Sequence, residues 1–558
     1  MTTIPHSLRA SYEEVPDRVA IRLLSNGEAE AMTWRSLFEG AAGYAAALAE
    51  AGVQPGEVVV LILQHGEALV HSFLGAMLRG AIPSIMPFLT EKLSPDQYRR
   101  SLTALIEITR PAALLTYPEF VAEVRAGIPL ESSVRRVLVS TSVNLAASCQ
   151  PSFLPGLSRS PDEVCLLQHS SGTTGLQKGV ALSHRAVLNQ VDCYAGAIRM
   201  TSDDTVVSWL PLYHDMGLIA GFIMPLLRRA PLVLMSPFDW VRAPHKLLQA
   251  VSNHRGTLSW LPNFAYNFCA AKIRDRDLGG VDLSSWRAVI NCSEPMRWAS
   301  HQMFLERFQP YGLRPQALAT CYAMAENVFA VSQGGIDGAV TVDEVDARSL
   351  FVERVARPTE TGERLKLLSA GTPISNTRVR ILDDQRHSLP DRHIGEIALQ
   401  SDCMLTGYFN RPDLTEKAFH EGWYLTGDLG YVANGEVYIT GRKKDLIIVG
   451  GKNVYPQDLE ELASQVPGVH PGRVVAFGVF SEQNGTEDAV VVAEANTEDA
   501  GQRRRIADEI RQRVTRGSDV ALRFVKIVDP HWLLKTSSGK VARAANREKY
   551  LKERAGPS

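Results

Sequence analysis

The amino-acid sequence predicts an α/β protein with two domains. Strand-like and helix-like segments alternate along most of the chain, as they do around a parallel sheet, and 558 residues exceed what one hydrophobic core usually serves. Hydrophobic residues at 45% and charged residues at 22% are ordinary for a globular protein. We expect a large N-terminal domain of parallel-sheet α/β subdomains at residues 1–440 and a small α+β domain at residues 441–558.

Composition narrows the classes of function. The net charge of −2 gives no indication of binding to nucleic acid or to an anionic membrane. The seven cysteines form no CxxC pair and are odd in number, which argues against a zinc site and a disulfide framework and favours a reducing cytoplasm. The N-terminus has no signal-peptide-like apolar core, and the longest apolar run, 217–227, is too short to span a bilayer.

The first predicted helix covers 32–52, with Thr33 as its N-cap and Gly52 as its stop. A second helix is expected at 67–79. Strands are expected at 58–63, 81–86, 112–117, 134–140, 206–210, 232–235 and 257–261. Because ligands of parallel α/β sheets bind at the carboxyl ends of the strands, the polar turns that follow these strands are the candidate sites.

The stretch 166–184 has the sequence LLQHSSGTTGLQKGVALSH. Glycines let the backbone approach a ligand closely, hydroxyls and backbone N–H groups suit an anion, and Lys178 adds positive charge. The residues that would surround a phosphate are Ser170, Ser171, Gly172, Thr173, Thr174 and Gly175. A flexible turn between two strands is the alternative. A Walker A loop is excluded, because its lysine directly follows the second glycine, whereas Gly175 is followed by Leu176.

This loop resembles the phosphate loop of the adenylate-forming superfamily, which includes acyl-CoA synthetases, peptide-synthetase adenylation domains, luciferases and fatty acyl-AMP ligases. Further motifs of that superfamily follow in its order: SWLPLYHDMG, AVINCSEP, ATCYAMAE, YLTGD, GRKKD and KTSSGK. The resemblance covers nearly the whole chain. It implies a mobile C-terminal domain and ATP with Mg²⁺ as cofactors.

The resemblance also implies an acyl site. From its residue type alone, His214 could be a general base, a metal ligand or a structural histidine, and the superfamily pattern places it beside the acyl carboxylate and the phosphates. Met216, Phe264 and Ala323 are implied to contact the acyl group, although the aromatic density around Phe264 is also typical of core packing. Ala323 replaces the glycine that is usual in the superfamily.

For the nucleotide, the resemblance implies that Ser293 and Glu294 border the adenine and that Tyr322 stacks on it. Asp428 and Arg442 correspond to the ribose contacts. Glu326 corresponds to the Mg²⁺ ligand, a role that a carboxylate oxygen suits. In the small domain, Lys444 corresponds to the hinge and Lys540 to the catalytic lysine, which can stabilise charge that develops on the carboxylate and the α-phosphate.

Residues 332–370 read as polar and irregular, which is typical of a surface loop. They also resemble an insertion that fatty acyl-AMP ligases carry and that restrains the small domain. The implied function is adenylation of a long-chain or bulky hydrophobic carboxylic acid, for transfer to the phosphopantetheine of an acyl or peptidyl carrier protein in lipid, polyketide or antibiotic biosynthesis.

Two alternatives remain. An acyl-CoA synthetase would complete the thioester with CoA, alone or with a second enzyme. A catalytically inactive adenylate-binding scaffold is disfavoured because five residues of the implied machinery are all present: Lys178, Glu326, Asp428, Arg442 and Lys540.

Overall fold

A computed structural model describes residues 2–25, 28–89, 95–145, 154–170, 178–359, 364–449, 452–481, 486–518, 522–536 and 540–555. Packing divides the chain into two compact units. Unit 1 comprises Met1–Thr341, Ala370–Arg378 and Gln400–Gly422, and unit 2 comprises Val342–Ser369, Val379–Leu399 and Trp423–Ser558. The chain therefore passes between the units more than once, and the domain boundary at 440 inferred from the sequence stays a prediction.

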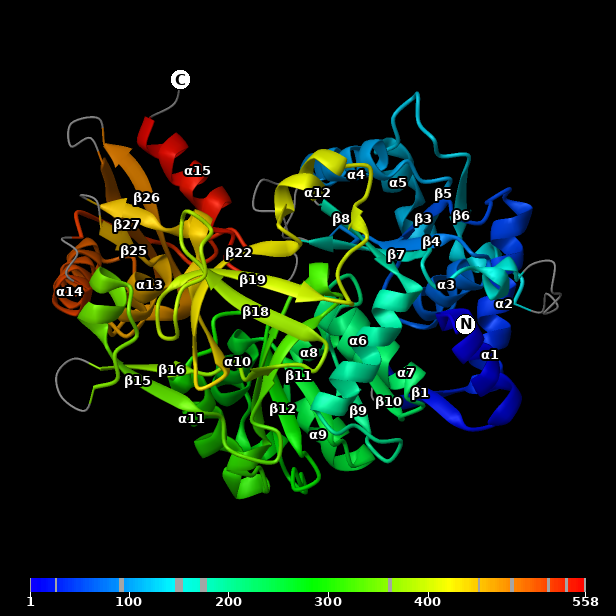
Figure 1. Ribbon diagram of the computed structural model, residues 1–558, viewed down its shortest axis with the longest axis horizontal. Helices are drawn as coiled ribbons and strands as arrows, with labels where there is room; N and C mark the ends of the chain where they lie inside the picture. Colours follow the sequence, from blue (N-terminus) through cyan, green and yellow to red (C-terminus); the bar gives the residue numbers. More distant parts are fainter. Residues whose placement is uncertain are drawn as a thin grey trace. The chain divides into compact units, whose positions relative to one another are not determined.

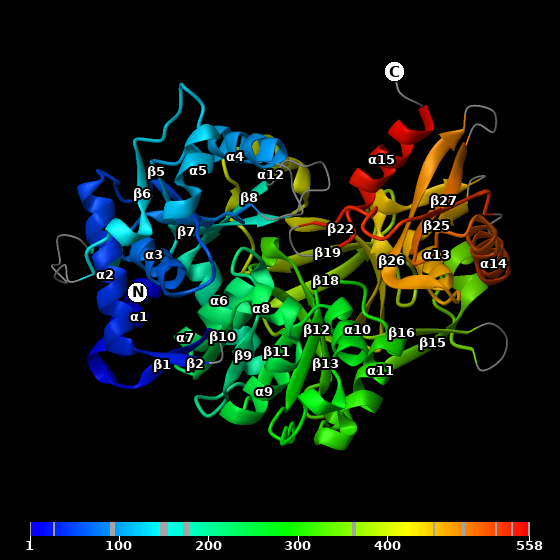
Figure 2. The same ribbon diagram turned by 180° about the vertical axis from the view of Figure 1, so that it is seen from behind.

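The larger sheet of unit 1 has nine strands in the order β17-β14-β13-β12-β11-β9-β10-β1-β2. Figures 1 and 2 show it from opposite sides, with β9, β11 and β12 next to one another. Its strands are β1 (Val19–Ser25), β2 (Glu28–Thr33), β9 (Val206–Ser208), β10 (Leu232–Met235), β11 (Leu258–Leu261), β12 (Ala288–Cys292), β13 (Leu318–Ala323), β14 (Ala330–Gly334) and β17 (Thr372–Pro373). The pairs that join β13, β12, β11, β9, β10 and β1 are parallel.

The second sheet of unit 1 has the order β20-β8-β7-β4-β3-β5-β6. Its strands are β3 (Val58–Ile62), β4 (Ile82–Ile85), β5 (Ala113–Thr116), β6 (Arg136–Val139), β7 (Val164–Ser170), β8 (Lys178–Ser183) and β20 (Gly407–Tyr408). The strands from β7 to β6 are parallel, whereas β8 is antiparallel to β7 and β20 is antiparallel to β8. The predicted α/β class is confirmed.

Helices of unit 1 follow most of these strands. They are α1 (Ile4–Glu14), α2 (Trp34–Glu50), α3 (Glu67–Leu78), α4 (Pro95–Thr109), α5 (Val121–Ala126), α6 (His184–Ala197), α7 (Met224–Leu227), α8 (Pro237–Arg242), α9 (His245–His254), α10 (Asn263–Lys272), α11 (Trp298–Phe308) and α12 (Pro412–Ala418). The expected cap of the first long helix is present, because the Thr33 side chain accepts a hydrogen bond from the Ser36 amide at the start of α2.

Unit 2 contains most of a sheet in the order β18-β19-β22-β21, with β23 paired to β22, and a separate three-stranded sheet β26-β27-β28. The strands that lie wholly or mostly in unit 2 are β15 (Val342–Asp346), β16 (Arg364–Leu368), β18 (Thr377–Leu382), β19 (Gly395–Ser401), β22 (Trp423–Ala433), β23 (Glu436–Arg442), β24 (Ile447–Val449), β25 (Lys452–Val454), β26 (Val469–Ser481), β27 (Thr486–Ala495) and β28 (Phe524–Val528). The residues of β21 (Phe419–His420) belong to unit 1. The helices of unit 2 are α13 (Pro456–Ser464), α14 (Ala500–Ser518) and α15 (Arg543–Ala555).

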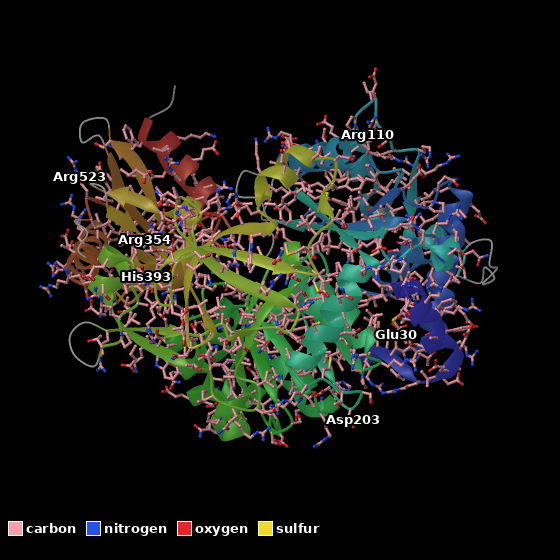
Figure 3. The ribbon with its side chains drawn as sticks, in the orientation of Figure 1. Glu30, Arg110, Asp203, Arg354, His393 and Arg523 are labelled. Atoms are coloured by element: carbon pink, nitrogen blue, oxygen red, sulfur yellow. The ribbon has the colours of Figure 1, made fainter. Side chains whose placement is uncertain are left out.

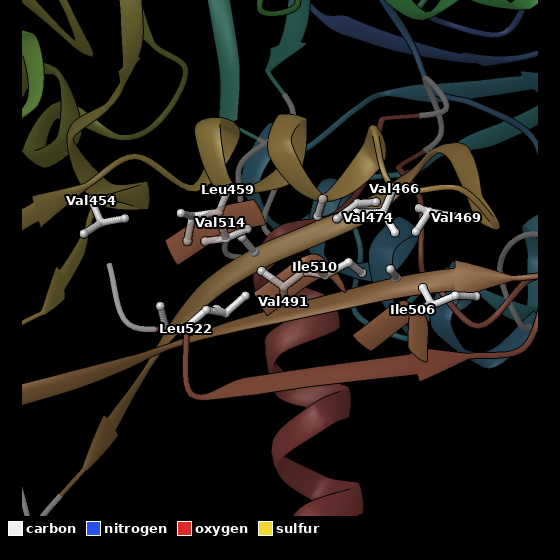
Figure 4. Close-up of a cluster of buried hydrophobic side chains, with 14 of the residues drawn as sticks. Val454, Leu459, Val466, Val469, Val474, Val491, Ile506, Ile510, Val514 and Leu522 are labelled. Carbon is white, nitrogen blue, oxygen red and sulfur yellow. The ribbon is translucent and has the colours of Figure 1, made fainter. Parts of the chain in front are cut away.

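The C-terminal part of unit 2 has its own core (Figure 4). Leu459 of α13 and Ile510 of α14 are fully buried against Val491 of β27. Burial of such aliphatic side chains supplies about 25 cal/mol per Å² of apolar surface removed from water. This compact α+β packing is the kind expected for residues 441–558.

The segment 332–370 differs from its prediction as an irregular excursion. Strands β15 and β16 form an antiparallel pair in the register Val342↔Leu368 to Asp346↔Arg364. Burial alternates along β15, where Asp343 and Val345 are buried, and Val345 packs in a core that distant parts of the chain complete. That core is not visible in the local sequence, so the polar composition alone suggested a loop.

This segment is fastened to the sheet of unit 2. Arg354 and His393 lie near each other in Figure 3. The amide of Ile394, the residue after His393, donates to the Arg354 carbonyl at 2.8 Å. Arg392 forms an ion pair with the largely buried Asp343 at 3.0 Å, and the Tyr431 hydroxyl donates to the same carboxylate at 2.8 Å. The described residues between 342 and 369 are thus a regularly structured part of unit 2.

Buried histidines make unit 1 sensitive to acid. Desolvation lowers the pKa of His169, His184 and His301 to about 4. The His184 Nδ1 atom accepts from the Ile4 amide at 3.4 Å, so this imidazole is neutral in the folded chain. Below pH 6.5 the unfolded chain binds protons that the folded chain does not, so stability falls as the pH decreases towards 4.

We expect the urea midpoint to fall steeply between pH 6.5 and pH 4.5, since each such histidine costs about 3 kcal/mol once the pH reaches its folded pKa. His301→Gln should reduce this dependence, because the amide keeps a partner for Asn291 and does not titrate. Urea unfolding followed by circular dichroism at several pH values measures the effect. Identical pH profiles for the variant and the wild type would contradict this assignment.

The described residues contain no disulfide, no metal-binding cluster and no membrane-spanning helix. The six cysteines within the described ranges are all free thiols. Across the described residues, no group of three or more His, Cys, Asp or Glu side chains could hold a metal ion. Helices in the described part of the chain include none long and apolar enough to cross a membrane.

Candidate functional site

The turns at the carboxyl ends of four adjacent strands carry most of the predicted residues of unit 1. His214 and Met216 follow β9, and Phe264 follows β11. Ser293 and Glu294 follow β12, whereas Tyr322, Ala323 and Glu326 lie at or just beyond the end of β13. These strands are parallel neighbours, so their carboxyl ends meet at one edge of the sheet, where such sheets bind ligands.

Lys178 and Glu326 come together through a residue that the sequence did not indicate, Tyr408. The Tyr408 hydroxyl donates to Glu326 Oε1 at 3.0 Å. Lys178 Nζ lies over the Tyr408 ring, 4.8 Å from its centroid. A cation and a carboxylate are therefore linked through one aromatic side chain.

Glu326 is buried, and its electrostatic surroundings are mixed. Burial raises the pKa of Glu326, and the neighbouring Asp215 raises it further. The hydrogen bond from Tyr408 and the positive charge of Lys178 act in the opposite direction. A buried carboxylate in this position gains from a cation.

The donor set around Glu326 fits a magnesium ion that arrives with a nucleotide. Magnesium is commonly held by one or two carboxylates together with substrate phosphates and water, without a cage of protein ligands. Glu326 provides a hard oxygen donor, and Asp215 is close enough to influence its pKa. Lys178 supplies positive charge that suits phosphates.

His214 lies in a half-buried turn directly before an unusual helix. Residues Met216–Ile223 form a buried π-helix, and the Asp215 carboxylate accepts from the Met216 amide at its start. A Cβ added to Gly217 would lie 2.3 Å from the Pro211 carbonyl oxygen, so only glycine fits this tight turn. π-Helical turns occur frequently at functional sites.

Phe264 belongs to an aromatic cluster, which we define as Trp209, Trp240, Phe264 and Phe268. Trp209 and Trp240 are stacked with ring centroids 3.6 Å apart. Phe264 meets both indoles edge-on, at 6.3 and 6.0 Å. Both interpretations of the sequence therefore apply: Trp209 and Trp240 are buried core residues, whereas Phe264 is half-buried beside the edge of the sheet.

The turn after β12 is held by polar contacts. Ser293 has φ 65°, a left-handed conformation that non-glycine residues seldom adopt. Glu294 accepts a hydrogen bond from the Phe264 amide at 2.9 Å, which satisfies a free N–H at the start of α10. Glu294 thus connects the predicted adenine turn with the residue predicted to contact the acyl group.

A strained residue follows Glu326. Val328 has φ 61° and ψ −53°, and the Phe329 amide donates to the Asn327 carbonyl at 2.6 Å, which closes a γ-turn around Val328. A positive φ is especially unfavourable for a β-branched residue. Such strain persists where the surrounding structure enforces it and is frequent at functional sites.

Unit 2 brings together the two predicted ribose contacts. Asp428 and Arg442 are directly opposite each other in the β22–β23 register, and Arg442 Nε donates to Asp428 Oδ1 at 3.0 Å. The carboxylate is largely buried, whereas the guanidinium is half exposed. The arrangement offers both an acceptor and a donor to a sugar hydroxyl.

The predicted hinge and catalytic lysines also lie in unit 2. Lys444 is exposed in a short turn between β23 and β24, and the adjacent Asp445 pairs with Arg543 at 2.6 Å. The backbone of Lys540 itself is held, because the Thr536 amide donates to the Lys540 carbonyl at 2.7 Å.

The central part of the predicted phosphate loop lies outside the described residues, with Ser171, Gly172, Thr173, Thr174 and Gly175. Its two ends are described. Ser170 ends β7 and Lys178 begins β8, and these two residues are directly paired in the antiparallel register. Both ends of the loop are thereby fixed to the same sheet.

Comparison with known proteins gives a consistent result. Residues 8–409 match the family of AMP-binding enzymes. FadD26 of Mycobacterium marinum, a long-chain-fatty-acid–AMP ligase, is 31% identical over 98% of this chain and 97% of its own length. JamA of Moorena producens, a medium-chain-fatty-acid–[acyl-carrier-protein] ligase, is 32% identical over 97% of this chain and 94% of its own.

A solved structure from work on fatty acyl-adenylate ligases of E. coli and L. pneumophila has a similar fold. Its TM-score is 0.89 at 27% sequence identity, and the match covers 100% of this chain and 98% of that one.

Proposed function

The chain belongs to the family of AMP-binding enzymes, and on that premise we propose that it activates a hydrophobic carboxylic acid as an acyl-adenylate. In this reaction a carboxylate oxygen attacks the α-phosphate of ATP, a new P–O bond forms, and the bond to the leaving pyrophosphate breaks. The observation that carries the proposal is the linked group of Lys178, Tyr408 and Glu326 at the edge where the parallel strands end.

The residues of unit 1 have separate roles in this proposal. Lys178 and the loop before it bind the phosphates, while Glu326 holds Mg²⁺, which neutralises phosphate charge when bound. Tyr322 stacks on the adenine beside Ser293 and Glu294. His214 lies beside the reacting carboxylate and orients it, so that much of the rate comes from positioning.

In unit 2, Asp428 and Arg442 bind the ribose. Lys540 stabilises the charge that develops on the carboxylate and the α-phosphate. We propose that residues 441–558 move as a small domain about Lys444 and deliver Lys540 for adenylation.

The proposed substrate is a long-chain or bulky hydrophobic acid. The aromatic cluster offers an apolar wall on which Phe264 is a half-buried member, and Met216 and Ala323 border the same edge of the sheet. The names of FadD26 and JamA refer to long-chain and medium-chain fatty acids, respectively, which supports this substrate class.

A carrier-protein phosphopantetheine is the proposed acceptor, as the name of JamA states for that relative.

The segment 342–369 supports a restraint on the small domain. Its buried residues Val345 and Leu350 pack in one cluster with Leu429 before the hinge position and Tyr455 after it. A contact that favours one orientation by about 3 kcal/mol reduces the population of another roughly a hundredfold.

The test is a comparison of acceptors. Purified protein receives ATP, Mg²⁺, a fatty acid and either CoA or a phosphopantetheinylated carrier protein, and the products are separated by mass. We expect acyl-AMP to accumulate with CoA and to be consumed with the carrier. Leu350→Asn should increase acyl-CoA formation by loosening the cluster, whereas Leu350→Met should not. Rapid acyl-CoA formation by the wild type would favour an acyl-CoA synthetase instead.

A reducing cytoplasm is the proposed location, because buried free thiols such as Cys165 and Cys269 are typical of reducing compartments. Lipid, polyketide or antibiotic biosynthesis is the proposed context, since those pathways use acyl groups on carrier proteins.

A further inference from the structure

The short strand β20 lies between the two parts of the proposed nucleotide site. On one side, the Leu405 amide donates to the Glu326 carbonyl at 2.8 Å. On the other side, the amides of Thr406 and Phe409 donate to the carbonyls of Ala181 and Gly179 on β8, at 2.9 and 2.8 Å. The backbone around Tyr408 therefore joins β8, which begins at Lys178, to the turn that carries Glu326.

The side chain of Tyr408, like its backbone, connects Lys178 with Glu326. It is 6% exposed, so its hydroxyl donates to Glu326 in a largely water-free environment, where a hydrogen bond to a carboxylate is strong. Its ring lies beneath the Lys178 ammonium, in the range of a cation–π interaction. One side chain thus contacts both charged groups.

A third contact fixes the position of Tyr408. Its backbone amide donates to Thr415 Oγ1 at 2.9 Å, and the same hydroxyl of α12 donates to the Arg411 carbonyl at 3.1 Å. Gly407, directly before Tyr408, is close to this side chain as well, since a Cβ there would lie 3.2 Å from Thr415 Oγ1. Thr415 therefore fixes the backbone of Tyr408.

We propose that Tyr408 is a positioning residue that aligns Glu326 for the metal and Lys178 for the phosphates. The hydroxyl uses one lone pair of Oε1 and restricts rotation of the carboxylate, which leaves the remaining lone pairs to bind a hard cation. The ring restricts the lysine to the same side of the loop. This inference rests on the proposed function, and the experiment below separates the two.

The main variant is Tyr408→Phe, which keeps the ring and removes the hydroxyl. Binding of ATP is measured by titration calorimetry, in EDTA and at a series of Mg²⁺ concentrations. In Tyr408→Phe, we expect the Mg²⁺ concentration that gives half of the maximal increase in ATP affinity to rise about tenfold, as for other groups that orient a metal ligand. Binding in EDTA should stay unchanged in Tyr408→Phe and weaken about threefold in Tyr408→Leu, which lacks the ring beneath Lys178.

The matched control is Tyr98→Phe. Tyr98 is also buried in unit 1, and its hydroxyl donates to the Pro87 carbonyl at 2.9 Å and not to a carboxylate. Loss of this hydroxyl should lower thermal stability without changing the Mg²⁺ dependence of ATP binding. A merely structural role of Tyr408 predicts the same behaviour for Tyr408→Phe.

Two further measurements test the route of the effect. In the Glu326→Gln background, Tyr408→Phe should no longer change the Mg²⁺ dependence, because the group on which it acts is neutral. Thr415→Val keeps Tyr408 but removes its anchor, and should raise the Mg²⁺ requirement by about threefold. If Tyr408→Phe were to unfold, Thr415→Val would still test the proposal.

The outcomes are distinct. An unchanged Mg²⁺ dependence in folded Tyr408→Phe, or a full effect that persists in the Glu326→Gln background, overturns the inference and leaves the proposed function intact. Failure of the wild type to bind ATP overturns both. Normal metal-dependent ATP binding without acyl-AMP formation overturns the proposed function alone.

Discussion

Lys540→Ala is expected to lower the rate of acyl-AMP formation by about two to three orders of magnitude while ATP still binds. Removal of one preorganised group that stabilises developing charge commonly has an effect of this size. The backbone at Lys540 is held by Thr536, whose hydroxyl accepts from the Lys540 amide at 3.2 Å, and this contact does not depend on the lysine side chain. ATP–pyrophosphate exchange with a preferred acid measures the rate.

The matched control is Lys552→Ala. Lys552 is an exposed lysine of α15 in the same unit, and its partner Glu548 lies one helical turn away at 2.8 Å. It carries the same charge and should tolerate truncation with little loss, as surface pairs of this kind contribute little. Equal exchange rates for Lys540→Ala and the wild type would contradict the assignment of Lys540.

The regular elements of unit 1 were predictable because their signals are local. The helix that begins after Thr33 has an N-cap and an apolar face, and strands such as Val58–Ile62 are continuous apolar, mostly β-branched runs bounded by turn residues. Once the strands are known to be parallel, the residues after them must meet at one edge. The grouping of His214, Ser293 and Glu326 follows from that rule.

The pairing of Asp428 with Arg442 was only partly predictable. The resemblance implies that both residues contact the ribose. That they lie directly opposite each other depends on the antiparallel register of β22 and β23, which shifts between Leu429 and Gly430. A shift by one residue turns a side chain to the other face of the sheet. The sequence does not reveal where such a shift occurs.

Tyr408 could not be found from the sequence. It lies in a strand of two residues, and both of its charged neighbours are far away in the chain: Glu326 by 82 positions and Lys178 in a different strand. The strands within 332–370 could not be predicted for the same reason, because Val345 and Leu350 pack in a cluster with residues beyond 390, such as Leu429. Local composition does not record packing partners at such separations.

Glu326→Gln provides the sharpest test of the metal assignment. The amide keeps the shape of the side chain and still accepts a hydrogen bond from Tyr408, but it lacks the negative charge that a hard cation requires. Because burial raises the pKa of Glu326, a neutral side chain costs less to bury, so the melting temperature should not fall. Any loss of activity then reflects the site and not the fold.

We expect the Mg²⁺ concentration for half-maximal ATP–pyrophosphate exchange to rise about a hundredfold in Glu326→Gln, since loss of a direct ligand should match or exceed the effect of losing an outer partner. Glu494→Gln is the matched control. Glu494 is also buried, in unit 2, and accepts from the Leu533 amide at 2.7 Å, so its replacement should affect stability alone. An unaltered metal dependence in Glu326→Gln would make Glu326 a structural residue. The magnesium ion would then have to be held by ATP and a different carboxylate. Asp215, whose charge influences the pKa of Glu326, is the neighbouring candidate.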